Sequence, residues 1–379
     1  MKDYLKDIHL INFKNFSDFK ESFYRINCFV GKNGVGKTNI LEAIHYLAFC
    51  KPYFSHNYEE ESIKFGENFF AIHGNYGSDG GEVFTKFSCI LKADEKKKFR
   101  ANDTAYQRLS DHIGTIPLVV VSPADQILVS GGADFQRTFL NYTLSQCDRE
   151  YLEALKDYNK ALEMRNRLLK NAQIERVFDN TQLESVDYLL SLSGNKIRAK
   201  RQELCDKLRE SIKVYHKLLS CESEDADLLY ESIETDDLFS LLQMNLKRDL
   251  ITGYTTAGVH KDRLNLTINE HKAKHFASQG QQKSLLLSLK LAQFDYVSDR
   301  KEGRKPILLL DDIFDKFDFE RVCSLLNLLV GGENRTENSS FGQIFITDTH
   351  LNRVEEVFKR TADTMNNFSP EDVNIRLLN

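Results

Sequence analysis

The chain has 379 residues, of which 41% are hydrophobic and 28% are charged, and its formal net charge is −5. This composition is typical of a globular protein with two or three lobes, and the acidic balance excludes a uniformly basic nucleic-acid-binding protein while leaving a local basic surface open. No apolar run approaches the roughly 20 residues that cross a bilayer, and the first residues lack a signal peptide's apolar stretch, so we expect a cytoplasmic protein without a membrane partner.

The first third of the chain is rich in short strands, and a helical region follows it. Apolar residues recur at helical spacing within residues 151–162 and 197–219, and a polar acidic stretch at 222–227 then predicts a loop. Strands return from about residue 251 and alternate with helices. The early strands are expected at residues 8–10, 26–30, 69–74, 84–91 and 118–121.

The strand at residues 26–30 leads directly into a glycine-rich loop with the spacing Gly-x-x-x-x-Gly-Lys-Thr. Glycines let successive backbone N–H groups face phosphate oxygens, and the start of the next helix adds partial positive charge. In such a loop Lys37 reaches the β- and γ-phosphates and the Thr38 hydroxyl coordinates Mg²⁺. The alternative, a glycine turn before an amphipathic helix, explains less of this context. We expect ATP and Mg²⁺ as cofactors, held by Gly31, Lys32, Asn33, Gly34, Val35, Gly36, Lys37, Thr38 and Asn39.

Aromatic and basic side chains offer candidate contacts to adenine and to DNA. Phe13 and Phe16 could stack on an adenine, although packing beside the first strand is the favoured alternative. Two basic clusters suit DNA phosphates, and solvated charged surfaces are the equal alternative. One cluster lies in a predicted hairpin and the other on a predicted helix: Lys92, Lys96, Lys97, Lys98 and Arg100; and Lys196, Arg198, Lys200, Arg201, Lys207, Arg209, Lys213 and Lys217.

A second anion-binding turn is indicated by Ser278, Gln279, Gly280 and Gln281. Ser278 is a candidate N-cap, and the N–H groups at the start of a helix favour an anion. A serine-capped helix without a ligand is the alternative. If this turn closes over ATP that is bound by another copy, the two copies share the nucleotide, and ATP then strengthens the homodimer.

The fully apolar run at residues 307–310 ends in two carboxylates. Such a run predicts a parallel strand that is buried on both faces. Asp311 at its tip can hold Mg²⁺ through water together with Thr38, and Asp312 can orient or deprotonate the attacking water. Taken alone, the pattern also fits a buried strand that enters an acidic turn.

Several segments together resemble the RecF family of bacterial DNA replication and repair proteins, which are SMC-like ABC-type ATPases. These are the phosphate loop with the residues that follow it and the segments at 122–125, 137–146, 258–262 and 277–283. Because the site elements lie in both outer parts of the chain, we predict an α/β fold. It would be an ABC-type P-loop ATPase head with a mixed sheet and flanking helices, formed by residues 1–125 and 251–379 and interrupted by an inserted helical lobe at 126–250.

The resemblance also implies what the protein does. A RecF-like ATPase uses hydrolysis as a conformational switch in recombinational repair, replication restart and the SOS response. It dimerises on ATP and binds gapped DNA and single-stranded/double-stranded junctions. Its implied partners are RecR- or RecO-type mediator proteins and a recombinase. Ser278 to Gln281 would contact the nucleotide of the opposite subunit, and the catalytic residues would be Lys37, Asp312 and His350, the last as the switch histidine or, alternatively, as a helix-start residue.

The chain departs from the family's pattern at several positions. Asp315 replaces the usual serine of the D-loop, in which Asp318 fits the family's aspartate. Val259 replaces a proline, and Gln136 replaces the first of two arginines. No clear Q-loop glutamine is present, and Gln126 is the nearest candidate.

Two other functional classes compete with this interpretation. A transport-type ATPase subunit would dock on membrane helices, but it predicts a short helical insertion rather than a long lobe. A structural DNA-binding subunit with a vestigial ATP site is the second, and the intact Lys37, Thr38 and Asp311 disfavour it.

Overall fold

The computed structural model describes residues 3–54, 59–78, 84–175, 180–220, 224–232, 237–301, 304–312, 319–330, 342–364 and 373–378. The chain forms two compact units. The first comprises Met1–Gln126, Leu218–Glu222 and Leu286–Asn379, and the second comprises Ile127–Lys217 and Ser223–Leu285. The second unit begins where we placed the start of a helical lobe, but it continues past residue 250.

The first unit contains a five-stranded parallel sheet whose central strands are buried on both faces. The strand order is β14-β3-β13-β12-β8, and every neighbouring pair is parallel. Fully apolar runs had predicted two of these strands, at residues 118–121 and 307–310, because a strand covered on both faces needs no polar side. The five strands are β3 (Ile26–Val30), β8 (Leu118–Val121), β12 (Ile307–Leu310), β13 (Ile344–Asp348) and β14 (Val373–Leu377).

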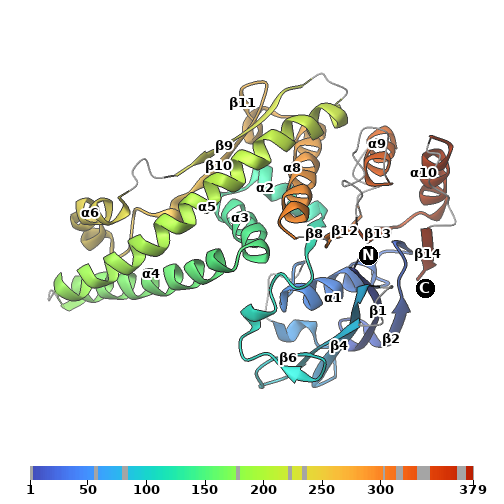
Figure 1. Ribbon diagram of the computed structural model, residues 1–379, viewed down its shortest axis with the longest axis horizontal. Coiled ribbons are helices and arrows are strands. Elements are labelled where there is room, and N and C mark those ends of the chain that lie inside the picture. The colour runs from blue at the N-terminus through green and yellow to red at the C-terminus, as the bar shows by residue number, and fades with distance from the viewer. Residues whose placement is uncertain are drawn as a thin grey trace. The chain divides into compact units, whose positions relative to one another are not determined.

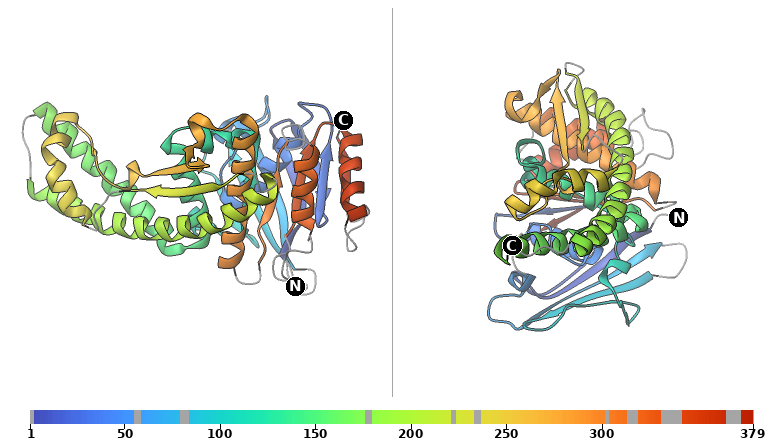
Figure 2. Two further views of the ribbon diagram at one scale, coloured as in Figure 1. Left: turned by 90° about the horizontal axis from the view of Figure 1, so that it is seen from above. Right: turned by 90° about the vertical axis from the view of Figure 1, so that its left-hand side faces the viewer.

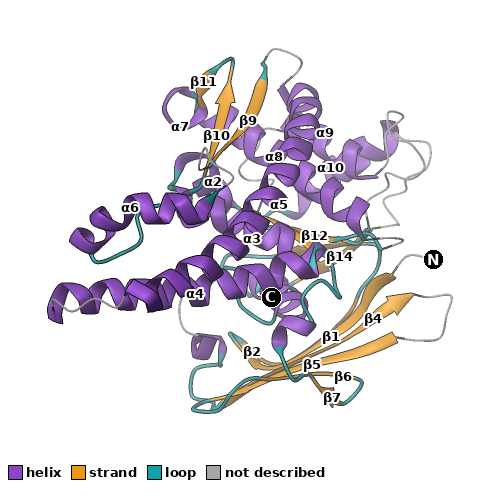
Figure 3. Cartoon of the chain, turned by 60° about the vertical axis from the view of Figure 1, so that its left-hand side comes forward, coloured by secondary structure: helices purple, strands orange, loops and turns teal. Residues whose placement is uncertain are grey.

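A six-stranded antiparallel sheet, ordered β2-β1-β4-β5-β6-β7, forms the other sheet of this unit (Figure 3). Helix α1 (Lys37–Phe49) contacts β13 of the parallel sheet and also β4 and β5 of the antiparallel sheet. Nearly all residues of α1 are therefore buried, since both sides of the helix are covered. The six strands are β1 (Asp3–Phe13), β2 (Phe16–Ser22), β4 (Phe69–Ser78), β5 (Phe84–Lys92), β6 (Lys98–Ala101) and β7 (Thr104–Ala105).

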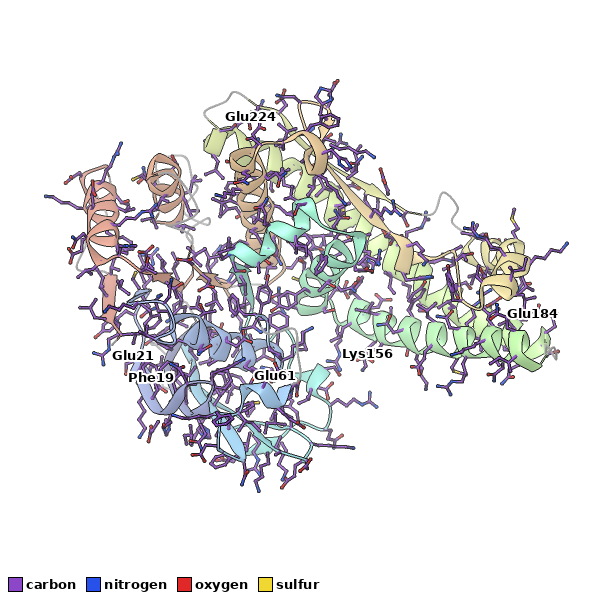
Figure 4. All side chains as sticks on the ribbon, turned by 180° about the vertical axis from the view of Figure 1, so that it is seen from behind. Phe19, Glu21, Glu61, Lys156, Glu184 and Glu224 are labelled. Atoms are coloured by element: carbon purple, nitrogen blue, oxygen red, sulfur yellow. The ribbon has the colours of Figure 1, made fainter. Side chains whose placement is uncertain are left out.

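The two aromatic residues that were candidates for adenine stacking have different environments. Phe13 is fully buried, and its ring lies 6.0 Å from that of Tyr46 and 5.3 Å from that of Phe70. Core packing is thus confirmed for Phe13. Phe16 is half-buried, and its ring lies 4.6 Å from that of Phe19, which is labelled in Figure 4.

Helix α8 (Gln279–Arg300) is a single helix of 22 residues that begins in the second unit and ends in the first (Figure 1). Within the first unit its Lys290 is buried, and the ammonium lies 3.1 Å from a carboxylate oxygen of Asp125. The hydroxyl of Tyr53 donates to the other oxygen of that carboxylate at 2.5 Å. Burial lowers the pKa of Lys290, and the Asp125 carboxylate opposes that shift. This buried group holds the second half of α8 against the residues that follow β8.

The remaining helices of the first unit are short. Helices α9 and α10 pack against each other. The elements are α9 (Phe319–Val330), α10 (Leu351–Thr364) and the 3-10 turns η1 (Glu59–Ser62), η2 (Leu109–Asp111) and η3 (Pro123–Gln126).

A buried histidine lies in the aromatic cluster beneath the antiparallel sheet. The Nε2 atom of His112 lies 2.6 Å from the carbonyl oxygen of Leu47, and its Nδ1 lies 3.2 Å from the hydroxyl of Tyr106. Both ring nitrogens are satisfied if Nε2–H donates to the carbonyl and Nδ1 accepts from the hydroxyl, which requires the neutral ring. Burial lowers the pKa of His112 to about 4, although the Leu47 carbonyl partly opposes the shift.

Acidification is expected to destabilise the protein through His112. Its folded pKa lies below the unfolded value near 6.5, so its contribution is fully present above that value and is lost as the pH falls toward 4. Between pH 7 and pH 5 this one group should remove about 2 kcal/mol from the free energy of unfolding. Urea unfolding at both pH values measures the loss, and in His112→Gln the pH dependence should shrink by that amount. An unchanged pH dependence would contradict the assignment.

The second unit is built around two long helices, α4 (Arg149–Glu175) and α5 (Asn180–Ser220), which diverge from one end of the unit (Figure 1). Helix α6 (Leu238–Thr252) packs on α4 near that end (Figure 2). No helix in the described ranges is both long and apolar enough to span a bilayer. The shorter elements are α2 (Ile127–Ser130), α3 (Ala133–Cys147), α7 (Ala273–Phe276) and η4 (Val259–Lys261).

Two buried arginines bring distant segments of the second unit together. The guanidinium of Arg165 lies 2.5 Å from the carboxylates of both Asp187 and Asp249, and all three side chains are inaccessible to solvent. Arg201 lies 2.6 Å from Asp262 and is 2% exposed. Removing one partner of such a buried pair typically costs about 3–5 kcal/mol, because the other charge is left buried and unpaired.

The second unit also contains a three-stranded sheet with the order β11-β10-β9. Its strands are β9 (Ala226–Glu231), β10 (Arg263–Ile268) and β11 (His271–Lys272). The prediction of a loop at residues 222–227 is therefore wrong for Ala226 and Asp227. Both residues belong to β9, which pairs with β10 along its whole length. Because β10 lies after residue 250, its pairing with β9 explains why the second unit continues beyond that residue.

Candidate nucleotide-binding site

A pocket of about 220 Å³ opens at the carboxyl edge of the parallel sheet. The segments that follow β3, β8 and β12, together with the end of β13, line it, because the carboxyl ends of parallel strands meet at one edge. The lining comprises Asn33, Gly34, Gly36, Lys37, Thr38, Asn39, Pro123, Asp311, Asp312 and Thr347. Most of the residues of the first unit that we predicted to bind the nucleotide thus line one pocket.

The glycine-rich loop has the backbone conformation that its glycines permit. Gly34 and Gly36 have φ angles of 87° and 110°, which side chains of L-residues rarely tolerate. A Cβ atom on Gly36 would also lie 2.7 Å from the side-chain amide of Asn15. Lys37 is 7% exposed, and its ammonium donates to the carbonyls of Gly31 at 2.6 Å and Lys32 at 3.0 Å. The ammonium is thereby held over the loop, where phosphate oxygens would be bound.

Thr38 and Asp311 form the candidate metal site. The Thr38 hydroxyl donates to Oδ1 of Asp311 at 2.9 Å, and the Thr347 hydroxyl donates to the same oxygen at 2.8 Å. Burial raises the pKa of the Asp311 carboxyl, and these two hydrogen bonds oppose the shift. Adjacent oxygen ligands of an octahedral Mg²⁺ lie about 3.0 Å apart when each Mg–O bond is about 2.1 Å. The two oxygen donors therefore fit Mg²⁺ in both chemistry and spacing.

Asp312 lies beside the metal site in an unusual backbone conformation. Its φ is 49°, and its backbone N–H donates to the Thr347 hydroxyl at 2.9 Å. Asp and Asn tolerate this left-handed region better than most residues do. Asp312 lines the same pocket as Lys37 and Thr38. Its role as a general base stays a prediction.

Asn15 supports the phosphate loop, and sequence reasoning missed it. Its amide nitrogen donates to the carbonyl of Val35 at 2.9 Å, and its amide oxygen accepts from the side chain of Asn39 at 2.9 Å. In the sequence Asn15 lies between Phe13 and Phe16. Those two residues were considered only as rings that could stack on adenine, so the amide between them was not considered. Asn15 thus fixes both sides of the turn from which α1 begins.

The second anion-binding turn, residues 278–281, belongs to the second unit and forms a reciprocal helix cap. The Ser278 hydroxyl accepts from the backbone N–H of Gln281 at 3.2 Å, and the side-chain oxygen of Gln281 accepts from the N–H of Ser278 at 2.7 Å. This is the capping-box arrangement at the start of α8. The Gln281 amide also donates to Glu224, labelled in Figure 4, at 2.9 Å. Ser278 and Gln279 remain exposed and Gly280 is half-buried, so the helix start is open to solvent.

Other candidate site residues lie elsewhere. His350 is exposed just before α10, where its backbone N–H donates to Asp348 at 2.6 Å, and it does not line the pocket. Its role as a switch histidine stays a prediction. Gln126 ends the η3 turn and is also absent from the lining. Asp315 and Asp318 fall outside the described residues.

The two basic clusters are largely neutralised by carboxylates. On α5, Arg209 and Lys213 share Asp227, while Lys200 and Lys217 pair with Asp148 and Asp225. Lys196 and Lys207 pair with glutamates. Arg201 is buried, so its assignment to a DNA-binding surface is wrong. In the hairpin, Lys92 and Lys98 share Glu95, and Lys97 is buried against Glu59.

Comparisons with known proteins support an ATPase. Residues 3–320 match the family model of the AAA ATPase domain. The DNA replication and repair protein RecF of Flavobacterium johnsoniae is 41% identical over 97% of this chain and 99% of that protein. RecF of Phocaeicola vulgatus is 40% identical over 97% of this chain and 96% of that protein.

Solved structures give the same result. The recombination mediator protein RecF with ATP, from the RecFOR pathway, superposes with a TM-score of 0.82 at 29% identity over 92% of both chains. The Smc head domain of Pyrococcus furiosus shares the fold, with a TM-score of 0.55 at 16% identity over 95% of this chain and 92% of that chain. The expected ABC-type ATPase fold is confirmed.

Proposed function

The chain belongs to the RecF family of DNA replication and repair proteins, and from this premise we propose that ATP joins two copies of it into a clamp on DNA. Family membership confirms an ATPase with a role in DNA replication and repair. The transport-subunit alternative is wrong for the same reason. The pocket at Lys37, Thr38 and Asp311 is the observation that carries the proposal, because these residues fit Mg·ATP.

The dimer rests on two separate anion-binding elements. The loop from Gly31 to Asn39 would hold the phosphates of ATP from one side. The open start of α8, with Ser278, Gln279, Gly280 and Gln281, would contact the γ-phosphate of ATP bound by the other copy, since uncharged N–H and hydroxyl donors at a helix start favour an anion. Linkage then requires ATP to tighten dimerisation by the factor by which dimerisation tightens ATP.

The proposal gives each candidate site residue a distinct task. Lys37 binds the β- and γ-phosphates, while Thr38 and Asp311 hold Mg²⁺, directly or through water. When bound, Mg²⁺ neutralises charge on the β- and γ-phosphates. Asp312 orients and deprotonates the attacking water, and His350 senses the γ-phosphate. Hydrolysis removes the shared group, so the clamp opens.

The partners follow from the family and not from a contact in this chain. The solved RecF structures are assigned to the RecFOR pathway, and we extend that assignment to this protein. Gapped DNA and single-stranded/double-stranded junctions are the proposed substrates, with RecR- or RecO-type mediators and a recombinase as protein partners. We propose that the protein acts on chromosomal DNA in the cytoplasm.

Sizing the purified protein tests the proposal directly. Light scattering should give a monomer without nucleotide or with ADP and a dimer with Mg·ATP, and gapped duplex should increase the dimer fraction. Lys37→Met serves as the control, because it removes the phosphate-binding ammonium and should remain monomeric throughout. A wild-type protein that stays monomeric in excess Mg·ATP, with and without gapped DNA, would overturn the clamp.

A further inference from the structure

We propose that a cationic groove on the second unit binds the phosphate backbone of single-stranded DNA. The groove has a volume of about 360 Å³ and lies between β10, β11, α7 and the start of α3. The inference deepens the proposed function and rests on it, because it assigns a place on this chain to the DNA. The residues that give the groove its chemistry are Gly132, Gln136, Arg263, Lys272, Lys274 and His275.

The charges of this groove differ from those of the two basic clusters. Arg263, Lys272 and Lys274 are exposed, and none of them has an ion pair with a carboxylate among the residues that the structure describes. Glu231 is the one acidic side chain of the lining; it lies opposite Arg263 in the β9–β10 register but forms no ion pair with it. Glu231 therefore offsets part of the charge of Arg263, whereas an incoming phosphate meets Lys272 and Lys274 without a competing carboxylate partner, unlike the cations of α5.

The local fold explains why these cations converge. Asn269 and Glu270, with φ angles of 49° and 67°, form the tight turn between β10 and β11. The turn brings Lys272 back beside Thr267, its partner in the strand register. Helix α7 follows at once and carries Lys274, whose ammonium lies 3.3 Å from the carbonyl of Gly131 at the opposite wall.

The floor and far wall of the groove are also suited to an anion. Helix α3 begins after Gly132 without a side-chain cap, so its first N–H groups add partial positive charge, and Asp134 in its first turn is paired with Arg137. Gln136, where the family's pattern has an arginine, is 8% exposed. Its amide oxygen accepts from the backbone N–H of Leu264 at 2.9 Å, and its amide nitrogen donates to the carbonyl of Leu128 at 3.4 Å. A buried neutral amide that is bonded to the backbone through both its oxygen and its nitrogen thus lines the groove, and the cations of the lining are exposed.

An exposed aromatic ring beside the groove favours a single strand over a duplex. Phe276 is 72% exposed, and its ring lies 5.5 Å from that of His271 and 6.5 Å from that of His275. Unpaired bases stack on such rings, whereas the bases of a duplex are already stacked on each other. Cations for the backbone and a ring for a base are the combination that single-strand-binding proteins use.

Charge reversal in the groove tests the proposal. The variant Lys272→Glu/Lys274→Glu should bind a fluorescent 30-nucleotide single strand at least about tenfold more weakly with ATP present, and its salt slope should fall by about 1.4 for two lost phosphate contacts. The matched control is Lys156→Glu/Lys160→Glu on α4, which makes the same change in net charge; Lys156 is labelled in Figure 4 and pairs with Glu153 at 3.0 Å. The control should bind within about twofold of wild type.

A second variant keeps the test independent of charge. Phe276→Ala should weaken single-strand binding about tenfold and leave duplex binding unchanged. Equal binding by wild type, groove variant and control would overturn the groove while leaving the ATP-driven clamp intact. A wild-type protein that binds no DNA in any nucleotide state would instead overturn the proposed function.

Two competitors separate DNA from other anions. Inorganic phosphate, at matched ionic strength, should not remove the difference between wild type and the groove variant; if it did, the groove would be a site for a free anion. Polyglutamate tests for an acidic protein segment. Tighter binding of polyglutamate than of the oligonucleotide, lost in the groove variant, would overturn the assignment to DNA.

Discussion

Ser278→Arg is expected to abolish ATP-dependent dimerisation while each monomer still binds ATP. The arginine side chain is long and would project from the exposed start of α8, where the proposed γ-phosphate of the other copy must approach closely. We expect dimer affinity in Mg·ATP to fall at least about 100-fold, since the shared contact provides the coupling. Monomer affinity for a fluorescent ATP analogue should stay within about twofold of wild type, because the phosphate loop is untouched.

Two further variants separate loss of the contact from loss of the helix cap. Threonine and aspartate both cap helices, so Ser278→Thr and Ser278→Asp should preserve the reciprocal bonds with Gln281. Only the aspartate adds a negative charge that repels phosphate. The threonine variant should therefore dimerise and the aspartate variant should not. Normal ATP-induced dimers of Ser278→Arg, measured by light scattering, would contradict the composite site.

Asp312→Asn is expected to stop hydrolysis and to leave the clamp closed. Asparagine tolerates the left-handed backbone at this position as well as aspartate does, so the loop should keep its shape. Losing the general base should lower the hydrolysis rate about 10²- to 10³-fold. Since the γ-phosphate then persists, ATP dimers should outlive those of the wild type.

Steady-state phosphate release and sizing over time measure the two effects separately. The double variant Ser278→Arg/Asp312→Asn is the control, and it should remain monomeric, because without the shared contact slow hydrolysis has no dimer to preserve. Hydrolysis by Asp312→Asn at the wild-type rate would remove Asp312 from the catalytic role. A normal rate in Ser278→Arg would show that one copy alone forms the complete active site.

The sequence predicted the parts of the site that depend on local pattern. The phosphate loop follows from glycine spacing after an apolar strand, and Asp311 follows from its place at the tip of a strand buried on both faces. Both are properties of a few consecutive residues, and the structure places both in one pocket. Thr347 escaped this reasoning, because its position beside Asp311 depends on the pairing of β12 with β13.

The basic residues show where local pattern fails. Counting lysines and arginines along residues 196–217 indicates a cationic surface, but the carboxylates that neutralise it come from other segments, such as Asp148 and Asp227. Arg201 is even buried against Asp262, which lies 61 positions away. The groove at Lys272 and Lys274 carries fewer charges in sequence, yet these have no acidic partner among the described residues. The electrostatic potential of a surface therefore depends more on which carboxylates pair with its lysines and arginines than on how many of these cations it has.

The unbroken course of α8 sets the direction of Ser278 about the helix axis relative to Lys290. Ser278 lies at one end of the helix, and Lys290, within it, is held by the buried carboxylate of Asp125. Each inserted residue turns an α-helix by about 100° and lengthens it by about 1.5 Å. One extra residue between these positions would change no motif, but it would turn Ser278 by about 100° around the helix axis relative to Lys290. The number of residues between Ser278 and Lys290 therefore matters as much to the direction of the Ser278 side chain as the identity of either residue.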